Sequence, residues 1–201
     1  MKCIEKTPKN LHKEIYEIIK NNQYESHLDI GCGTGALIKR LKGNVKKSFG
    51  TDINKKEFKL KGVDFEKADL NKKFPFKNEK FDLITAVEII EHVENQFSFI
   101  REAAVRLNKK GKFILTSPNI YNIWSKLFFL FKNRFINFLE KDLKEHINPV
   151  IDNILLHTVK QNKLKLIKKS YSSCHIPYIN LYIPIKNRFL GNVAIYLFEK
   201  Y

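Results

Sequence analysis

The sequence feature that constrains the fold most is a glycine-rich segment that directly follows an apolar run. It occupies residues 28–35 and reads LDIGCGTG. The apolar run before it and the helical pattern of residues 36–41 after it predict a strand, a tight turn and the start of a helix. Glycines permit positive φ and let a ligand lie against N–H groups at a helix N-terminus. The spacing Gly-x-Gly-x-Gly differs from the dinucleotide fingerprint Gly-x-Gly-x-x-Gly, so a pyrophosphate cradle is not the best fit.

Acidic residues close the next two predicted strands. Residues 47–53 read as a strand that ends near Asp52, about twenty residues after the glycine segment begins, which is the distance that a βαβ unit gives. Residues 63–70 read as a further strand ending at Asp69. Asp52 is therefore expected beside the end of the first strand, where a ribose would lie.

The rest of the pattern predicts an α/β fold. Residues 80–87 and 112–117 read as buried strands, and five strands alternating with helical segments indicate a parallel, doubly wound sheet with helices on both faces. Further helices are expected over 9–20, 95–107 and 150–162, with a glycine, Gly111, close after the second. Two closing strands are expected over 163–171 and 192–200, and an aromatic loop with Tyr178 and Tyr182 lies between them.

The length of 201 residues predicts one domain over 1–201. Within it, residues 1–24 are interpreted as a cap with its helix, and residues 119–148 as an aromatic insertion that serves as a lid or docking surface. In a helical projection of 123–139, apolar and aromatic side chains share one face and basic ones lie opposite. Such a segment can pack on the sheet, close over a substrate or lie on a membrane surface, but it is too short to span a bilayer.

Charge and cysteine content bear on partners and compartment. The formal net charge is +16, which suggests nucleic acid, anionic lipid or a phosphorylated substrate as partner, unless the lysines only form a solvated surface. The three cysteines are odd in number and lack metal-ligand spacing, which suits a reducing compartment. Without an apolar signal segment near Met1, a cytoplasmic protein is expected, with a peripheral position at the inner membrane surface as a variant of it.

Taken together, these motifs resemble those of class I S-adenosylmethionine-dependent methyltransferases. The resemblance rests on 28–35, on Asp52, on Asp69-Leu70, and on the run from Phe74-Pro75-Phe76 to the strand at 81–84, and it covers 25–120 almost continuously. It implies a Rossmann-like sheet of seven strands, mostly parallel, with an antiparallel C-terminal hairpin. It also implies these S-adenosylmethionine-binding residues: Asp29, Gly31, Cys32, Gly33, Gly35, Asp52, Ile53, Asp69, Leu70, Val87 and Glu88.

A cluster of potential metal ligands follows the strand at 80–87. Glu88, Glu91 and His92 lie at i, i+3 and i+4, so a helical turn would place them on one face, and such a set suits Mg²⁺, Mn²⁺, Fe²⁺ or Zn²⁺. The pattern resembles metal-binding motifs of ubiquinone-pathway O-methyltransferases and of small-RNA 2′-O-methyltransferases, which implies that His146 completes the set. Without a metal, Glu88 lines the cofactor pocket and His92 acts as the base. His92 and His146 are the catalytic candidates.

The acceptor is left open between three hypotheses. The first is methyl transfer to a hydroxyl of a small, glycan-linked or lipid-linked acceptor. The second is metal-assisted 2′-O-methylation of RNA, suggested by the charge and by Lys163, Lys165, Lys168 and Lys169 near tyrosines. The third is a non-catalytic, cofactor-binding partner subunit. His12, His27, His157 and His175 are interpreted as surface or core residues without a catalytic role.

Overall fold

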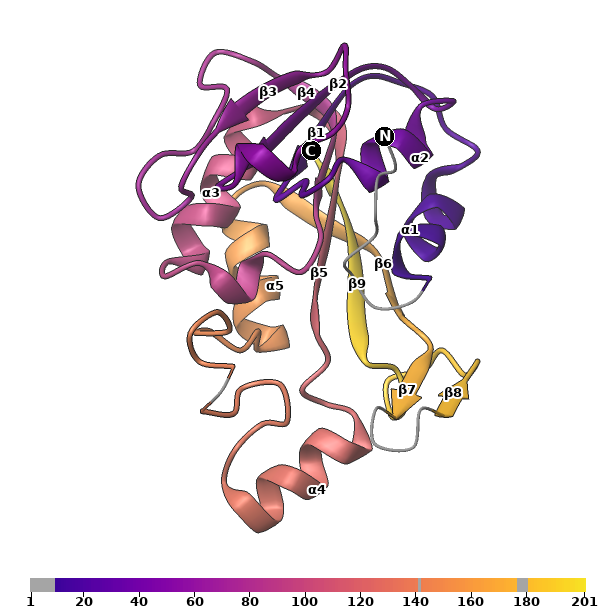
Figure 1. Ribbon diagram of the computed structural model, residues 1–201, viewed down its shortest axis with the longest axis vertical. Coiled ribbons are helices and arrows are strands. Elements are labelled where there is room, and N and C mark those ends of the chain that lie inside the picture. Colours follow the sequence, from indigo (N-terminus) through magenta and orange to yellow (C-terminus); the bar gives the residue numbers. More distant parts are fainter. Residues whose placement is uncertain (1–9, 141, 177–180) are drawn as a thin grey trace.

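The computed structural model describes residues 10–140, 142–176 and 181–201 and shows a mixed sheet with helices on both faces (Figure 1). The seven-stranded sheet has the order β3-β2-β1-β4-β5-β9-β6. Strands β1 to β5 pair in parallel, whereas β9 is antiparallel to both β5 and β6. The predicted α/β sheet with an antiparallel C-terminal hairpin is thus confirmed. The sheet strands are β1 Tyr24–Ile30, β2 Val45–Asp52, β3 Asp64–Lys67, β4 Phe81–Ala86, β5 Leu107–Pro118, β6 Leu164–Tyr171 and β9 Val193–Lys200.

Two apolar layers hold helices against the sheet. Side chains of α1 (Leu11–Ile19) and α2 (Ala36–Leu41) share one buried cluster, and α3 (Gln96–Arg106) and α5 (Asp152–Gln161) contribute to the other. Strand β9 shows why both layers form: Tyr196 and Phe198 join the layer of α3 and α5, whereas Val193 and Ile195 join the opposite one. This alternation is the period of two that a strand buried on both faces requires.

Local capping explains where two helices begin. The side-chain oxygen of Asn95 accepts a hydrogen bond from the backbone N–H of Ser98 at the start of α3, at 2.8 Å. Asn122 does the same for Ser125 at the start of α4 (Ile123–Lys132), at 2.7 Å. Each cap satisfies one of the N–H groups that a helix N-terminus leaves without an intrahelical acceptor.

The structure differs from the predicted pattern at three places. Helix α3 ends at Arg106, and Gly111 lies inside β5, where a Cβ would come within 2.8 Å of the carbonyl oxygen of Asn108. The expected loop around Tyr182 contains a small antiparallel pair, β7 (Cys174–Ile176) and β8 (Leu181–Ile183), whereas Tyr178 lies outside the described residues. The expected helix over 123–139 stops at Lys132.

The early end of α4 has a local cause. Asn133 adopts a left-handed conformation with φ of 53° and closes the helix by donating its N–H to the carbonyl of Phe129. The chain then turns back, and the ring of Phe135 stacks on that of Phe129 with centroids 4.9 Å apart. Helix α4 therefore stands out from the sheet at the lower end of the molecule (Figure 1). In the described ranges, no helix is long and apolar enough to cross a membrane.

Candidate functional site

A cleft opens where the carboxyl ends of β1, β2 and β3 meet the turn after β4. Its volume is about 380 Å³, within the roughly 300–1,000 Å³ of small-molecule sites. Ligands of open α/β sheets bind at this edge, at the point where the strand order reverses. The lining residues are Gly31, Thr51, Asp52, Ile53, Ala68, Asp69, Leu70, Asn71, Ile89, His92, Val93 and Glu145.

The glycine segment brings backbone to one wall of this cleft. Gly31, Gly33 and Gly35 have φ of 70°, 50° and 82°, a region that side-chain-bearing residues rarely adopt. A Cβ on Gly31 would lie 2.0 Å from Cδ1 of Ile89, another lining residue, whereas a Cβ on Gly33 would meet nothing within 4 Å. Gly31 is therefore required both by conformation and by close approach.

Asp52 is oriented by the same segment. One of its carboxylate oxygens accepts the N–H of Gly33 and the other that of Asn54, each at 2.8 Å. Charge-assisted bonds of this kind hold the carboxylate at the edge of the cleft, with lone pairs left for a ligand hydroxyl. The sequence placed five cofactor candidates that do line the cleft: Gly31, Asp52, Ile53, Asp69 and Leu70.

The other cofactor candidates do not line the cleft: Asp29, Cys32, Gly33, Gly35, Val87 and Glu88. Cys32 is buried, and burial raises the pKa of its thiol well above the ordinary range, so in this structure it serves as a packing residue. Asp29 lies beneath the cleft, accepts the hydroxyl of Thr85 at 2.6 Å, and has its pKa raised by burial to about 7. Thr85 in turn lies 2.8 Å from Nε2 of His27, whose pKa burial lowers to about 3.

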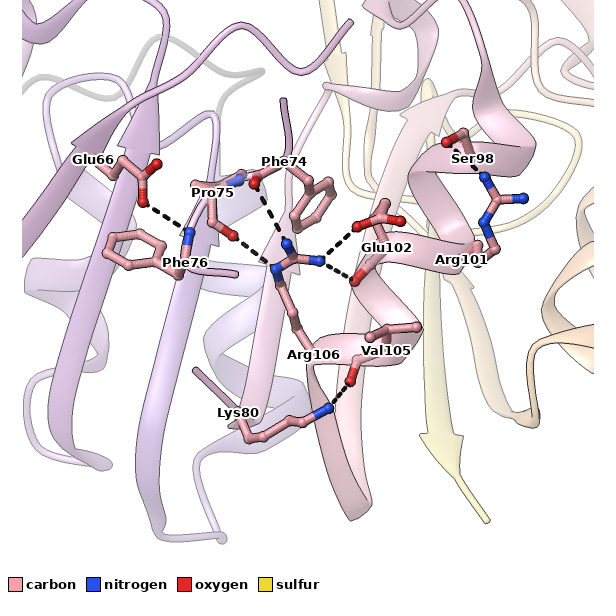
Figure 2. A network of polar contacts seen from close by, with 10 residues as sticks. All are labelled: Glu66, Phe74, Pro75, Phe76, Lys80, Ser98, Arg101, Glu102, Val105 and Arg106. Carbon is pink, nitrogen blue, oxygen red and sulfur yellow. Dashed lines mark hydrogen bonds and ion pairs between the residues drawn. The ribbon is translucent and has the colours of Figure 1, made fainter. Parts of the chain in front are cut away.

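The loop that follows Asp69 and Leu70 is fastened to α3 by one buried arginine (Figure 2). Arg106 is 4% exposed; it donates to the carbonyls of Pro75 at 2.7 Å and Phe74 at 3.4 Å, and pairs with Glu102 at 2.8 Å. Across the loop, the N–H of Phe76 donates to Glu66 at 2.8 Å. These bonds hold in place residues 74–76, which directly follow the cleft-lining residues Asp69, Leu70 and Asn71.

A cluster of potential metal ligands adjoins the cleft. One ligand atom each from Glu91, His92 and His146 lie within 4.8 Å of one another, and the two imidazole rings are 4.9 Å apart at nearly right angles. Because His92 also lines the cleft, cleft and cluster share this residue.

Backbone carbonyls set the orientation of both imidazoles. Nδ1 of His92 lies 2.8 Å from the carbonyl oxygen of Glu145, and Nδ1 of His146 lies 2.8 Å from that of Asn137. A carbonyl only accepts, so each Nδ1 acts as the donor, and in the neutral form of either ring the lone pair would then be on Nε2. Burial lowers the pKa of His92, and the charge of His146 adds to this effect, while the contact with Glu145 opposes it. Histidine ligands of metals are fixed by such outer hydrogen bonds.

The carboxylate of Glu91 is the most unusual group of the cluster. It is fully buried, and neither oxygen has a hydrogen-bond partner in the described part of the chain. Burial, together with the nearby charge of Glu88, raises the pKa of Glu91 well above its usual range. A buried, unpaired carboxylate is costly unless a proton or a cation compensates it.

Glu88, the further metal-ligand candidate, is not part of the group formed by Glu91, His92 and His146. Glu88 adopts a left-handed backbone with φ of 54° and its carboxylate meets the hydroxyl of Thr116 at 3.2 Å. The short 3₁₀ helix that carries Glu91 and His92 spans Ile90–His92, so it begins two residues after Glu88. Glu88 therefore precedes the helical turn instead of belonging to it.

Sequence reasoning missed the residues that bring His146 to the cluster. The N–H groups of Ile147 and Asn148 both donate to the backbone carbonyl of Glu91 at 3.0 Å. The side-chain amide of Asn148 donates to the backbone carbonyl of Val93 at 2.7 Å. The only signal was the proximity of Asn148 to Pro149 in the sequence. The chain from 145 to 148 is thus tied to the turn that carries His92.

Within the basic set near the tyrosines, Lys169 makes internal contacts, whereas Lys163, Lys165 and Lys168 are exposed. Lys169 pairs with Asp152 and lies over the rings of Tyr121, Tyr171 and Tyr196. Tyr196 itself is buried. Lys169 therefore serves an internal contact and does not belong to an open base-stacking surface.

Comparison of the sequence with known proteins identifies a methyltransferase domain family, whose model matches residues 28–115. A ubiquinone biosynthesis O-methyltransferase from Bartonella bacilliformis is 30% identical over 152 residues, which cover 70% of this chain and 60% of that protein. A second protein so named, from Thiobacillus denitrificans, is 30% identical over 99 residues, which cover 45% and 42%. The chain thus spans about half the length of the curated relatives that it matches.

Solved structures share the fold over nearly the whole chain. An S-adenosylmethionine-dependent methyltransferase from Clostridium acetobutylicum superposes with a TM-score of 0.66 at 16% identity, covering 96% of this chain and 92% of that one. The N-methyltransferase NodS from Bradyrhizobium japonicum, in complex with S-adenosyl-L-homocysteine, has a TM-score of 0.64 at 12% identity, covering 98% and 89%. At this identity the likeness concerns the fold alone.

Proposed function

We propose that this chain, whose residues 28–115 match a methyltransferase domain family, transfers a methyl group from S-adenosylmethionine to a hydroxyl of a small molecule. The observation that carries the proposal is the position of His92. It lines the cleft and belongs to the Glu91-His92-His146 cluster, so the groups that would bind the donor and those that would receive the acceptor meet at one side chain.

The chemistry of the cleft fits the proposed cofactor. S-adenosylmethionine carries no phosphate, and the cleft offers acidic and apolar groups where a phosphate would need cations. Asp52 would accept the ribose hydroxyls, Asp69 would accept the adenine amino group, and Ile53 and Leu70 would supply apolar contact to the ring. The cofactor supplies a methyl group already activated by its sulfonium. What this chain adds is position, since orientation can contribute roughly 7 to 11 kcal/mol to such a reaction.

The hydroxyl acceptor is supported by the relatives and by the histidines. Two relatives bear the name O-methyltransferase. A hydroxyl must lose its proton as it is methylated, and His92, which lines the cleft, is the side chain that would accept that proton. The lowered pKa of His92 keeps the ring neutral at pH 7, as a base or a metal ligand must be.

We further propose that the Glu91-His92-His146 cluster binds a divalent cation. The orphaned carboxylate of Glu91 is the observation that fits it, because one oxygen donor and two imidazoles suit Mn²⁺, Fe²⁺ or Zn²⁺ and compensate the buried charge. Such a cation lowers the pKa of a bound hydroxyl. His92 would then act as a ligand, and in the absence of the metal as the base.

Separate readouts of binding and turnover test the proposal. His92→Ala is expected to lower methylation of catechol-type and quinol-type acceptors by about 10²–10⁴-fold, while the Kd for S-adenosylmethionine, measured by calorimetry, changes less than twofold. His157→Ala, an exposed histidine of α5, is the matched control and should retain activity. Loss of cofactor affinity in His92→Ala would contradict its assignment to the acceptor. Absence of cofactor binding by the unaltered protein would refute the function.

Metal binding is tested without activity. Titration of metal-free protein with Mn²⁺ or Zn²⁺ should show one site, and Glu91→Gln and His146→Ala should each weaken it at least about tenfold. Glu88→Gln should leave the affinity within about threefold, because Glu88 lies outside the cluster. Stoichiometric binding that survives Glu91→Gln, or no binding at all, would contradict the metal proposal and leave His92 as the base.

A further inference from the structure

Helix α4 exposes the largest group of apolar side chains on one element. Leu130 is 70% and Phe131 76% exposed, and Ser125 is the single buried residue of the helix. A neighbouring segment adds to the same surface, because the N–H of Ile123 donates to the carbonyl of Phe189, whose side chain is also exposed. We call this set the α4 surface; its exposed apolar members are Ile123, Trp124, Leu127, Phe129, Leu130, Phe131, Ile185 and Phe189.

Basic residues surround the α4 surface. Lys126 and Lys132 are exposed on the helix, Arg134 follows it, and Lys186 and Arg188 precede Phe189. Residues 103–139 and 153–198 contain no aspartate or glutamate, so both segments that build this end of the molecule contribute cations alone. Arg134 and Lys186 meet the acidic groups of Glu140 and Glu14 from other segments, which leaves the charge of this end positive.

These features agree with one kind of partner. Exposed apolar patches rimmed by charge mark interaction sites, and aromatic side chains with lysines at their edges suit the boundary between lipid headgroups and acyl chains. A ten-residue helix is about 15 Å long, half the roughly 30 Å of a bilayer core, so α4 would lie in the plane of the surface. We propose that the α4 surface docks the protein on an anionic lipid bilayer.

Aromatic contacts connect this surface with the metal-ligand cluster. The ring of Phe129 stacks on Phe135 at 4.9 Å, Phe135 meets Phe138 at 6.5 Å, and Phe138 meets His146 at 5.7 Å. A bilayer under α4 would thus contact one end of this chain of aromatic rings. The other end of the chain is His146, on the proposed acceptor side. This connection rests on the proposed function, whereas the docking itself does not.

The single tryptophan of the chain gives a direct probe, because Trp124 belongs to the α4 surface. Vesicles of phosphatidylcholine containing phosphatidylglycerol should shift its fluorescence to shorter wavelength and carry the protein down on sedimentation. Vesicles of phosphatidylcholine alone should bind at least about tenfold less, and added salt should weaken binding. No binding to the anionic vesicles, or binding without a fluorescence shift, would overturn the proposal.

Paired variants separate docking from general adsorption of a basic protein. Leu130→Glu/Phe131→Glu should lower partitioning at least about tenfold, and Lys126→Glu/Lys132→Glu at least about twentyfold, since each basic residue near an anionic surface contributes about fivefold. Val105→Glu and Lys109→Glu/Lys110→Glu, at the opposite end of β5, are the matched controls. They should change the partitioning onto anionic vesicles less than twofold. Equal losses in the controls would overturn the proposal.

A second copy of the chain is the competing occupant. Sedimentation velocity should show that the unaltered protein is a monomer and that Leu130→Glu/Phe131→Glu is a monomer as well. An unaltered affinity for the cofactor would show that the variant is folded. A dimer that this variant dissociates would instead assign the α4 surface to self-association and overturn lipid docking.

Discussion

The two sides of the candidate site are built in different ways. The proposed cofactor side consists of the ends of successive strands and the turns after them, all between Gly31 and Ile89. The acceptor side joins the turn at 90–92 to residues 145–148, which lie more than fifty positions away and are held by side-chain and backbone bonds. The proposed donor site thus follows from local chain geometry, and the proposed acceptor site from long-range contacts.

This difference predicts which substitutions should disrupt the proposed donor site and which should disrupt the proposed metal-ligand cluster. The cofactor side depends on buried groups beneath the cleft and on glycines that approach closely, so small changes there should alter stability or donor affinity and spare metal binding. The acceptor side depends on a few tethers, so removing one should weaken the metal cluster and spare the donor. Four variants test this separation, beginning with the largest expected effect.

Asp29 should make stability depend on pH. Its folded pKa of about 7 lies above the unfolded value, so between pH 4 and 7 the native state holds a proton that the unfolded chain has lost. This contribution to the free energy of unfolding is present at pH 4, falls as pH rises and levels off above 7, by up to about 4 kcal/mol. Asp29→Asn should lack it.

Urea unfolding of both proteins at pH 4 to 8 measures the effect as a difference curve. The difference removes most of the opposite contribution of His27, which is neutral when folded and charged in the unfolded chain below about pH 6.5. Parallel curves would show that Asp29 is ionised in the native state throughout.

Arg106→Met should destabilise the wall of the cofactor side by about 3 kcal/mol, because the carbonyls of Phe74 and Pro75 lose their donor in a buried position. Chemical unfolding measures the change. Arg101→Met is the matched control on the same helix, since Arg101 meets Ser98 at the surface (Figure 2), and it should cost less than about 0.5 kcal/mol. Equal effects would refute the role of Arg106 in fastening the loop.

Gly31→Ala should weaken S-adenosylmethionine binding by about 2 kcal/mol, or roughly thirtyfold in Kd, because the new methyl group displaces Ile89 from the cleft wall. Gly33→Ala shares the positive φ but meets no atom within 4 Å, so it reports the conformational cost of about 1 kcal/mol without the displacement. Calorimetric titration of both variants separates the two causes. Equal losses would mean that close approach at Gly31 is unimportant.

Asn148→Ala should weaken Mn²⁺ binding by about 1 kcal/mol, or roughly fivefold, because its side chain no longer ties residues 145–148 to the carbonyls of Val93 and Glu94. The donor affinity should stay within twofold. Asn153→Ala, an exposed neighbour, is the control. An equal loss of donor affinity in Asn148→Ala would show that the two sides are not separable.

The sequence by itself determined the sheet and the cofactor side. The strand over 28–30, the glycine turn, Asp52 and Asp69 follow one another at spacings that a βαβ chain imposes, so their meeting at one edge is a consequence of local periodicity. The closing strand expected over 192–200 similarly corresponds to β9. These features depend on neighbours in the chain, which a sequence displays directly.

Only the tertiary structure decided the rest. It excluded Glu88 from the metal-ligand cluster, because a left-handed residue interrupts the helical turn, and it brought His146 to His92 through backbone bonds that no spacing reveals. It also ended α4 at Lys132 and left the aromatic helix exposed, although its amphipathic pattern was compatible with burial. An amphipathic face indicates that a segment covers something, and the surrounding packing alone decides what it covers.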